Sequence, residues 1–160
     1  MCIRDSYIGE YIKNKGQIIA NDISKEKLPL IKENIDRLAL ENIKLSSFDA
    51  SIFNKEYEGQ FDYVLVDAPC SGLGVMGRKP EIRYNRSMDD IKILAELQKD
   101  ILDQAIKYLK KDGVLVYSTC TIGDIENKEN FLFLSSQDDL ELIPIEGKDY
   151  IEYVLSLIHI

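Results

Sequence analysis

The sequence predicts a doubly wound α/β fold built on a mostly parallel sheet. Short apolar runs typical of buried strands alternate along the chain with longer segments in which apolar residues recur every three or four positions, as on one face of a helix. Strands joined through helices need crossover connections, which place helices on both faces of a parallel sheet. The 160 residues, 45% of them hydrophobic, suffice for one domain of ordinary size.

The predicted elements alternate in a regular order. Ser24 is expected to begin a helix, and Lys111, Asp112 and Gly113 are expected to end a later one. The apolar spacing predicts helices over 24–40, 88–110 and 124–134. The short apolar or alternating runs predict strands over 17–21, 43–48, 61–66, 114–118 and 140–145.

Composition limits the functions that the chain can have. The net charge of -8 argues against broad attraction to phosphate, although the segment 77–86 gathers four cations, Arg78, Lys79, Arg83 and Arg86. Three scattered cysteines and one histidine give neither a disulfide framework nor zinc-ligand spacing, which fits a reducing cytoplasm. No apolar run approaches the length of a membrane helix, and the absence of a usable histidine removes Ser-His-Asp and Cys-His hydrolases.

Polar and nucleophilic residues follow four of the predicted strands. Asp22, Asp49, Asp67 and Cys120 each stand at or just beyond a strand end. Ligands of open α/β sheets bind outside the carboxyl ends of the strands, so we expect the chemistry to lie along one edge of the sheet.

Two cysteine motifs carry a family resemblance. Residues 67–74 read Asp-Ala-Pro-Cys-Ser-Gly-Leu-Gly and residues 118–121 read Ser-Thr-Cys-Thr. Together they resemble the Sun-type RNA cytosine-5 methyltransferases, whose bacterial members modify small-subunit ribosomal RNA. The resemblance extends over about residues 7–145 and implies a Rossmann-like fold that uses S-adenosylmethionine, with the segment 7–13 forming a helix.

The resemblance implies covalent catalysis on RNA, with ribosomal RNA as the expected substrate. Carbon 5 of cytosine becomes nucleophilic once a thiolate adds to carbon 6. The family pattern assigns that attack to Cys120 and assistance in release to Cys70. DNA cytosine-5 methyltransferases attack with the Pro-Cys thiol instead, so the Thr-Cys motif argues against that class. The alternative reading of both cysteines is two small buried core residues.

The same resemblance assigns the acids and the basic loop. Asp22 is expected to bind the cofactor ribose, Asp49 the adenine, and Asp67 both the methionine end and the target base. The alternatives are a helix cap, a solvated loop residue and a strand-end cap, respectively. Residues of the 77–86 segment are expected to bind RNA, with Tyr84 stacking on a base; a solvated basic surface is the alternative. These residues are Arg78, Lys79, Arg83 and Tyr84.

Family members carry a first strand and a Gly-rich loop where this chain has residues 1–6. We therefore expect residues 7–154 to form a partial methyltransferase catalytic domain that lacks this strand and loop. Residues 1–6 and 155–160 continue no neighbouring pattern and are expected to be non-native terminal segments. The alternative function is an inactive fragment that binds neither cofactor nor RNA. We expect a monomer without a metal, and a helix N-terminus downstream of Cys120 that favours its thiolate.

Overall fold

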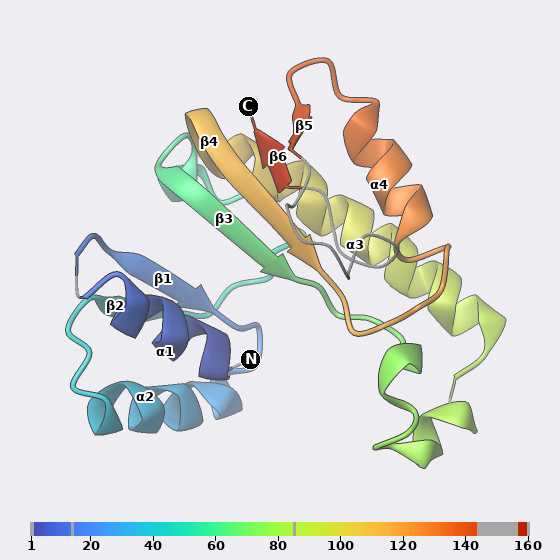
Figure 1. The fold of residues 1–160 in the computed structure, drawn as a ribbon, viewed down its shortest axis with the longest axis horizontal. Coiled ribbons are helices and arrows are strands. Elements are labelled where there is room, and N and C mark those ends of the chain that lie inside the picture. The colour runs from blue at the N-terminus through green and yellow to red at the C-terminus, as the bar shows by residue number, and fades with distance from the viewer. Residues whose placement is uncertain (1, 14, 85, 144–156, 160) are drawn as a thin grey trace. The chain divides into compact units, whose positions relative to one another are not determined.

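The computed structural model describes residues 2–13, 15–84, 86–143 and 157–159. The chain divides into two compact units, residues 1–50 and 51–160, each with its own strands and helices (Figure 1). Each unit also has its own buried apolar cluster. Parallel strand pairs with crossover helices give the α/β fold that the sequence predicts.

The first unit is a β-α-β arrangement preceded by a helix. Strands β1 (Ile18–Asn21) and β2 (Ile43–Ser46) pair in parallel, and α2 (Leu28–Arg37) connects them. Helix α2 buries Ile31 and Ile35 in an apolar cluster with the strand residues that follow it. The first helix, α1 (Cys2–Tyr11), begins five residues before the predicted start at residue 7.

The start of α2 differs from the prediction. Ser24 makes no side-chain capping hydrogen bond, and a 3-10 turn over Lys25–Lys27 precedes the α-helix. Pro29 lies in the first turn of α2, where its fixed φ and missing N–H are tolerated. The helix therefore begins at Leu28, four residues later than predicted.

The second unit contains a four-stranded sheet in the order β3-β4-β6-β5. Strands β3 (Phe61–Asp67) and β4 (Leu109–Ser118) are parallel and are joined through α3 (Met88–Tyr108). Short 3-10 turns lie at Lys55–Tyr57, Leu73–Val75 and Pro80–Arg83. Helix α4 (Lys128–Ser135), β5 (Glu141–Ile143) and β6 (Leu157–His159) complete the described elements.

The carboxyl-terminal strands depart from the predicted parallel arrangement. Strand β6 lies between β4 and β5 and is antiparallel to both. It belongs to the segment 155–160, which the sequence pattern left outside the fold. Of the predicted strand 140–145, residues 141–143 form β5, and residues 144 and 145 lie outside the described part of the chain.

Strand β4 begins earlier than predicted and is interrupted near its start. It follows α3 directly at Leu109, and its register against β3 shifts between Phe61 and Tyr63. Asp112 takes a positive φ of 64°, and a Cβ on Gly113 would lie 2.9 Å from the carbonyl oxygen of Lys110. The residues that were predicted only to end the helix therefore form an irregular turn within the strand.

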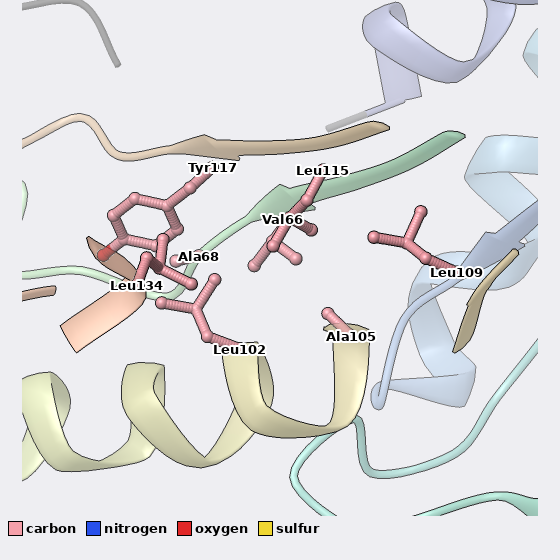
Figure 2. Close-up of a cluster of buried hydrophobic side chains, with 8 residues drawn as sticks. All are labelled: Val66, Ala68, Leu102, Ala105, Leu109, Leu115, Tyr117 and Leu134. Carbon is pink, nitrogen blue, oxygen red and sulfur yellow. The ribbon is translucent and has the colours of Figure 1, made fainter. Parts of the chain in front are cut away.

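The core of the second unit lies between the β3–β4 pair and helices α3 and α4. Figure 2 shows side chains of both strands pointing toward α3, with Leu134 of α4 beside them. Leu102 and Leu115 are fully buried at the centre of this cluster. No helix in the described part of the chain is both long enough and apolar enough to cross a membrane. The cluster fixes the two strands whose carboxyl ends carry the cysteine loops.

Leu102→Ala should lower the free energy of unfolding by about 2–5 kcal/mol, because it leaves a cavity at a site with no exposed surface. Ile93→Ala on the same helix removes a side chain that is 68% exposed and should change stability by only about 0.5 kcal/mol. Urea unfolding followed by circular dichroism measures both. Equal effects would contradict the assignment of Leu102 to the core.

Candidate active site

The two cysteine loops start from neighbouring positions at the carboxyl ends of β3 and β4. Asp67 and Ser118 are partners in the parallel register, and the amide of Ala68 donates to the carbonyl of Ser118 at 2.9 Å. The chain leaves both strands at the same level of the sheet. Cys70 and Cys120, which are 50 positions apart in sequence, are thereby brought together at the carboxyl ends of the two strands, where the sequence predicted them.

The thiols of Cys70 and Cys120 meet above these strand ends. Their sulfur atoms lie 3.0 Å apart, and the amide of Cys120 donates to the Cys70 sulfur at 3.2 Å. Both cysteines are free thiols. Cys120 is exposed while Cys70 is half-buried, so Cys120 is the more accessible of the two residues. The alternative of two buried core cysteines does not fit this placement.

The environment of Cys70 favours its neutral form. Burial, together with the side-chain hydrogen bond to Cys120, raises the pKa of the Cys70 thiol to about 11, although hydrogen bonds from the backbone amides of Cys120 and Gly72 oppose the shift. At neutral pH Cys70 is therefore a protonated thiol. Such a group can donate a hydrogen bond or a proton, but it is a poor nucleophile.

Two glycines let the Cys70 loop approach the Cys120 loop. Gly72 has a φ of +76°, in the left-handed region, where residues with a side chain are strained. The amide of Gly74 donates to the carbonyl of Cys120 at 3.1 Å, and a Cβ at Gly74 would lie 2.8 Å from that oxygen. The close contact between the two loops therefore requires glycine at position 74.

A buried acid lies beneath the cysteine loops. Glu126 is fully buried, and its carboxylate accepts hydrogen bonds from the amide of Ser71 at 2.8 Å and from the Ser71 hydroxyl. The Ser71 hydroxyl also pairs with the Thr121 hydroxyl at 2.9 Å. Ser71 follows Cys70 and Thr121 follows Cys120, so this chain of bonds links the residues next to both thiols.

Three further side chains complete the buried network. The amide of Gln98 donates to the Pro69 carbonyl at 2.8 Å and to the Glu126 carboxylate at 3.0 Å. Tyr117 donates to the Gln98 side-chain oxygen at 3.0 Å and Asn130 donates to it at 2.7 Å. Burial raises the pKa of Tyr117, which remains a neutral donor. α3, β4 and α4 thus all contribute to the network.

Sequence reasoning missed this network. Gln98 stands on the apolar face of α3 between Ala95 and Leu102, and a polar residue at such a position is a signal of a buried hydrogen bond. Its partners lie 19 to 32 residues away. No local pattern identifies them.

Asp67 lies at the end of β3, as predicted. Its carboxylate accepts a hydrogen bond from the Ser118 hydroxyl at 3.2 Å. The side chain is half-buried beside the base of the Cys120 loop. This position is compatible with both the strand-end role and the substrate-facing role that the sequence left open.

Asp22 and Asp49 belong to the first unit. Asp22 is 6% exposed; its carboxylate accepts from the amide of Ser24 at 2.9 Å and from the exposed Lys27 ammonium at 3.3 Å. This bond to Ser24 precedes the 3-10 turn over Lys25–Lys27, whereas α2 begins only at Leu28. Asn21 exchanges two hydrogen bonds with the backbone of Phe48, which fixes the ends of β1 and β2 together and places Asp49 just past them.

The basic loop is exposed. Arg78, Lys79 and Tyr84 are all exposed, and Tyr84 borders a hollow of about 550 Å³. Arg83 lies in the 3-10 turn that begins at Pro80; its side chain is outside the described part of the structure. The hollow is lined by Met76, Gly77, Pro80 and Tyr84.

The expected helix N-terminus lies further from Cys120 than predicted. α4 begins at Lys128 rather than at residue 124, and the intervening residues form a turn in which the Asn127 side chain donates to the carbonyls of Thr121 and Gly123. A helix N-terminus acts mainly within its first turn. Among the described residues, no group of three or more His, Cys, Asp or Glu side chains could hold a metal ion.

Comparisons with known proteins agree with this arrangement. The chain is 44% identical over 140 residues to the probable ribosomal RNA small subunit methyltransferase B of Bacillus subtilis, covering 86% of this chain and 31% of that protein. It is 34% identical over 145 residues to ribosomal RNA small subunit methyltransferase F of Psychromonas ingrahamii, covering 89% and 30%. The chain thus spans about a third of the length of these relatives.

A solved structure and a family model complete the comparison. The crystal structure of NSun6 from Pyrococcus horikoshii with SFG is similar at a TM-score of 0.74 and 31% identity, over 96% of this chain and 43% of that one. The model of the 16S rRNA methyltransferase RsmB/F family matches residues 4–156, which include both cysteine motifs. This chain, with two thiols at the ends of adjacent parallel strands, belongs to the RsmB/F family of 16S rRNA methyltransferases.

Proposed function

We propose that this chain forms the catalytic part of an enzyme that methylates carbon 5 of a cytosine in small-subunit ribosomal RNA, with S-adenosylmethionine as methyl donor. The observation that carries the proposal is the pair of free thiols 3.0 Å apart, one exposed and one half-buried, at the carboxyl ends of β3 and β4. The names of the Bacillus and Psychromonas relatives support the RNA substrate. The Pyrococcus horikoshii relative was solved with SFG, an analogue of S-adenosylmethionine, which supports the cofactor.

Cys120 acts as the nucleophile. Its exposed sulfur adds to carbon 6 of cytosine as a thiolate, which makes carbon 5 electron-rich enough to accept a methyl group. A water molecule then accepts the carbon 5 proton, the electron pair of that C–H bond restores the double bond between carbons 5 and 6, and the bond from carbon 6 to sulfur breaks to return Cys120 as a thiolate. S-adenosylmethionine supplies only the methyl group.

Cys70 assists the release of the product. Its pKa of about 11 keeps the thiol protonated at neutral pH, and its sulfur lies 3.0 Å from the Cys120 sulfur. A neutral thiol at that distance can donate a hydrogen bond to Cys120 as the latter leaves as a thiolate. In this step Cys70 acts in its protonated form, which its burial favours.

The acids bind the cofactor and the base. Asp22 accepts hydrogen bonds from the cofactor ribose; its carboxylate fits this role because Lys27, its partner at 3.3 Å, is an exposed and movable side chain. Asp49 accepts from the adenine amino group. Asp67 faces the methionine end of the cofactor and the target base. A proton shared between its carboxylate and nitrogen 3 of the cytosine favours addition of the Cys120 thiolate to carbon 6.

The exposed basic loop binds the RNA. Arg78, Lys79 and Arg83 contact phosphates, and the ring of Tyr84, which is 82% exposed, stacks on a base beside the 550 Å³ hollow. Local cations are needed because the chain as a whole carries a net charge of -8.

Substitution of each cysteine tests the two roles. In a chimera in which this chain replaces the matching 140 residues of the Bacillus subtilis relative, Cys120→Ala should abolish transfer of tritiated methyl groups to unmodified ribosomal RNA. Cys70→Ala should instead let a covalent RNA adduct accumulate, visible as a band of retarded mobility in denaturing gels. Equal adduct formation by both variants would refute the assignment.

Asp22→Ala in the same chimera should weaken S-adenosylmethionine binding by about 1.5–3 kcal/mol, because a charge-assisted hydrogen bond to the ribose is lost. Lys27→Ala is the matched control, since it removes the ion pair but keeps the carboxylate. Calorimetric titration measures both. An unchanged dissociation constant for Asp22→Ala would leave this residue with its role at the start of the helix alone.

The raised pKa of Cys70 predicts a pH-dependent labelling pattern. In a Cys2→Ser background, iodoacetamide should label Cys70 slowly near neutral pH, with an initial rate that rises about tenfold per pH unit and levels off near pH 11. The reason is that the buried thiol ionises only as the pH approaches its pKa. Peptide mass spectrometry gives the rate, and a plateau below pH 9 would contradict the assignment of Cys70 as the protonated partner.

A further inference from the structure

The buried network beneath the cysteine loops holds the residues on both sides of Cys70. The carbonyl of Pro69 accepts from the Gln98 amide at 2.8 Å, and the amide of Ser71 donates to the Glu126 carboxylate at 2.8 Å. Gln98 and Glu126 are themselves joined at 3.0 Å. The backbone of Cys70 is therefore fixed before and after the thiol by two fully buried side chains.

The same network reaches the other cysteine. The hydroxyl of Ser71, which donates to Glu126, lies 2.9 Å from the hydroxyl of Thr121, the residue after Cys120. Because Ser71 is 1% exposed and Thr121 8% exposed, water competes little for these bonds. Glu126 thus connects the Cys70 loop to the Cys120 loop from below.

We propose that Glu126 is a positioning residue that sets the separation of the two thiols. It touches neither sulfur; it acts through Ser71, whose amide and hydroxyl it holds. This proposal rests on the proposed function only in so far as the paired thiols serve catalysis. The arrangement itself belongs to the chain and can be tested without substrate.

Glu126 has the chemistry that this task requires. A buried carboxylate without partners is costly, whereas this one accepts hydrogen bonds from Ser71 and Gln98 in directions that its two oxygens fix. The backbone carbonyl of Glu126 accepts a hydrogen bond from the Asn130 amide at 2.9 Å and lies 2.8 Å from the Tyr117 hydroxyl, whose single hydrogen is shared with the Gln98 side-chain oxygen. Hydrogen bonds therefore hold both the carboxylate and the backbone carbonyl of Glu126, so the positions of α3, β4 and α4 determine where it holds the two loops.

A purely stabilising role would have a different signature. Glu126 would then contribute to the free energy of unfolding, but the distance between the sulfur atoms in the folded protein would not depend on it. The equilibrium between the Cys70–Cys120 dithiol and its disulfide in a glutathione buffer depends on how closely and in what orientation the two thiols are held. One glutathione disulfide is reduced to two glutathione thiols as the bond forms, so the equilibrium constant is the effective concentration of one thiol at the other.

The experiment uses the 160-residue chain with Cys2→Ser, so that Cys70 and Cys120 are the remaining cysteines. Samples equilibrated in glutathione buffers are quenched with acid, alkylated and quantified by mass spectrometry. Glu126→Ala should lower the effective concentration about tenfold or more, because Ser71 and Gln98 lose a buried acceptor. Glu126→Gln should stay within about threefold, because the amide oxygen can accept from Ser71 and Gln98 while its NH₂ group donates to the Ser71 hydroxyl.

Leu134→Ala is the matched control. It removes a buried apolar side chain from α4 and lowers stability without taking a hydrogen bond from either loop. Circular dichroism at each glutathione ratio verifies that the variants are folded. The expected result is an unchanged effective concentration in Leu134→Ala and a reduced one in Glu126→Ala.

A second variant covers the case in which Glu126→Ala does not fold. Ser71→Ala keeps the hydrogen bond from the backbone amide of residue 71 to the Glu126 carboxylate but removes the hydroxyl that bridges to Thr121. It should lower the effective concentration at least about threefold. Wild-type values in Ser71→Ala, or a loss in Leu134→Ala equal to that in Glu126→Ala or Ser71→Ala, would overturn the proposal. Methyl transfer by the chimera is scored separately, so an inactive chimera with the expected thiol equilibria would refute the function and not the positioning role.

Discussion

The parallel register between β3 and β4 is the constraint on which the site depends. Pairing of Asp67 with Ser118 makes the chain leave both strands at the same level, so loops from distant parts of the sequence meet there. The cluster around Leu102 and Leu115 holds this pair of strands in place from one side (Figure 2). A shift of one residue would turn the strand side chains to the opposite faces and separate the two thiols.

Beneath the loops, the structure uses polar groups where an apolar core would be the simpler solution. Gln98, Glu126 and Asn130 are fully buried, and each makes several hydrogen bonds. Such a network gains little net stability over apolar packing, but its hydrogen bonds have defined directions. Apolar contacts would leave the loops free to shift, whereas these bonds fix the backbone on both sides of Cys70. The network therefore contributes more to the position of the two thiols than to the stability of the fold.

Asp22 shows how a residue that makes local structural bonds in the first unit also stands at a strand end. Its carboxylate receives the Ser24 amide, which starts the turn before α2, and also faces the exposed ammonium of Lys27. The Asn21 side chain ties the ends of β1 and β2 together, so the acids that follow both strands are held by the backbone pairing. A residue that caps an element at a strand end is already placed where ligands of α/β sheets bind.

The sequence alone determined the alternation of strands and helices, the acids at the strand ends and the two cysteine motifs, because all of these are local patterns of residue type and spacing. The family resemblance assigned Cys70 and Cys120 as partners before any distance was known. Tertiary structure decided the 3.0 Å separation of their sulfur atoms, the unequal exposure of the two thiols and the antiparallel place of β6. It also decided the side-chain partners of Gln98 and Glu126, because hydrogen bonds between residues 19 to 55 positions apart depend on how the elements pack, which no local pattern records.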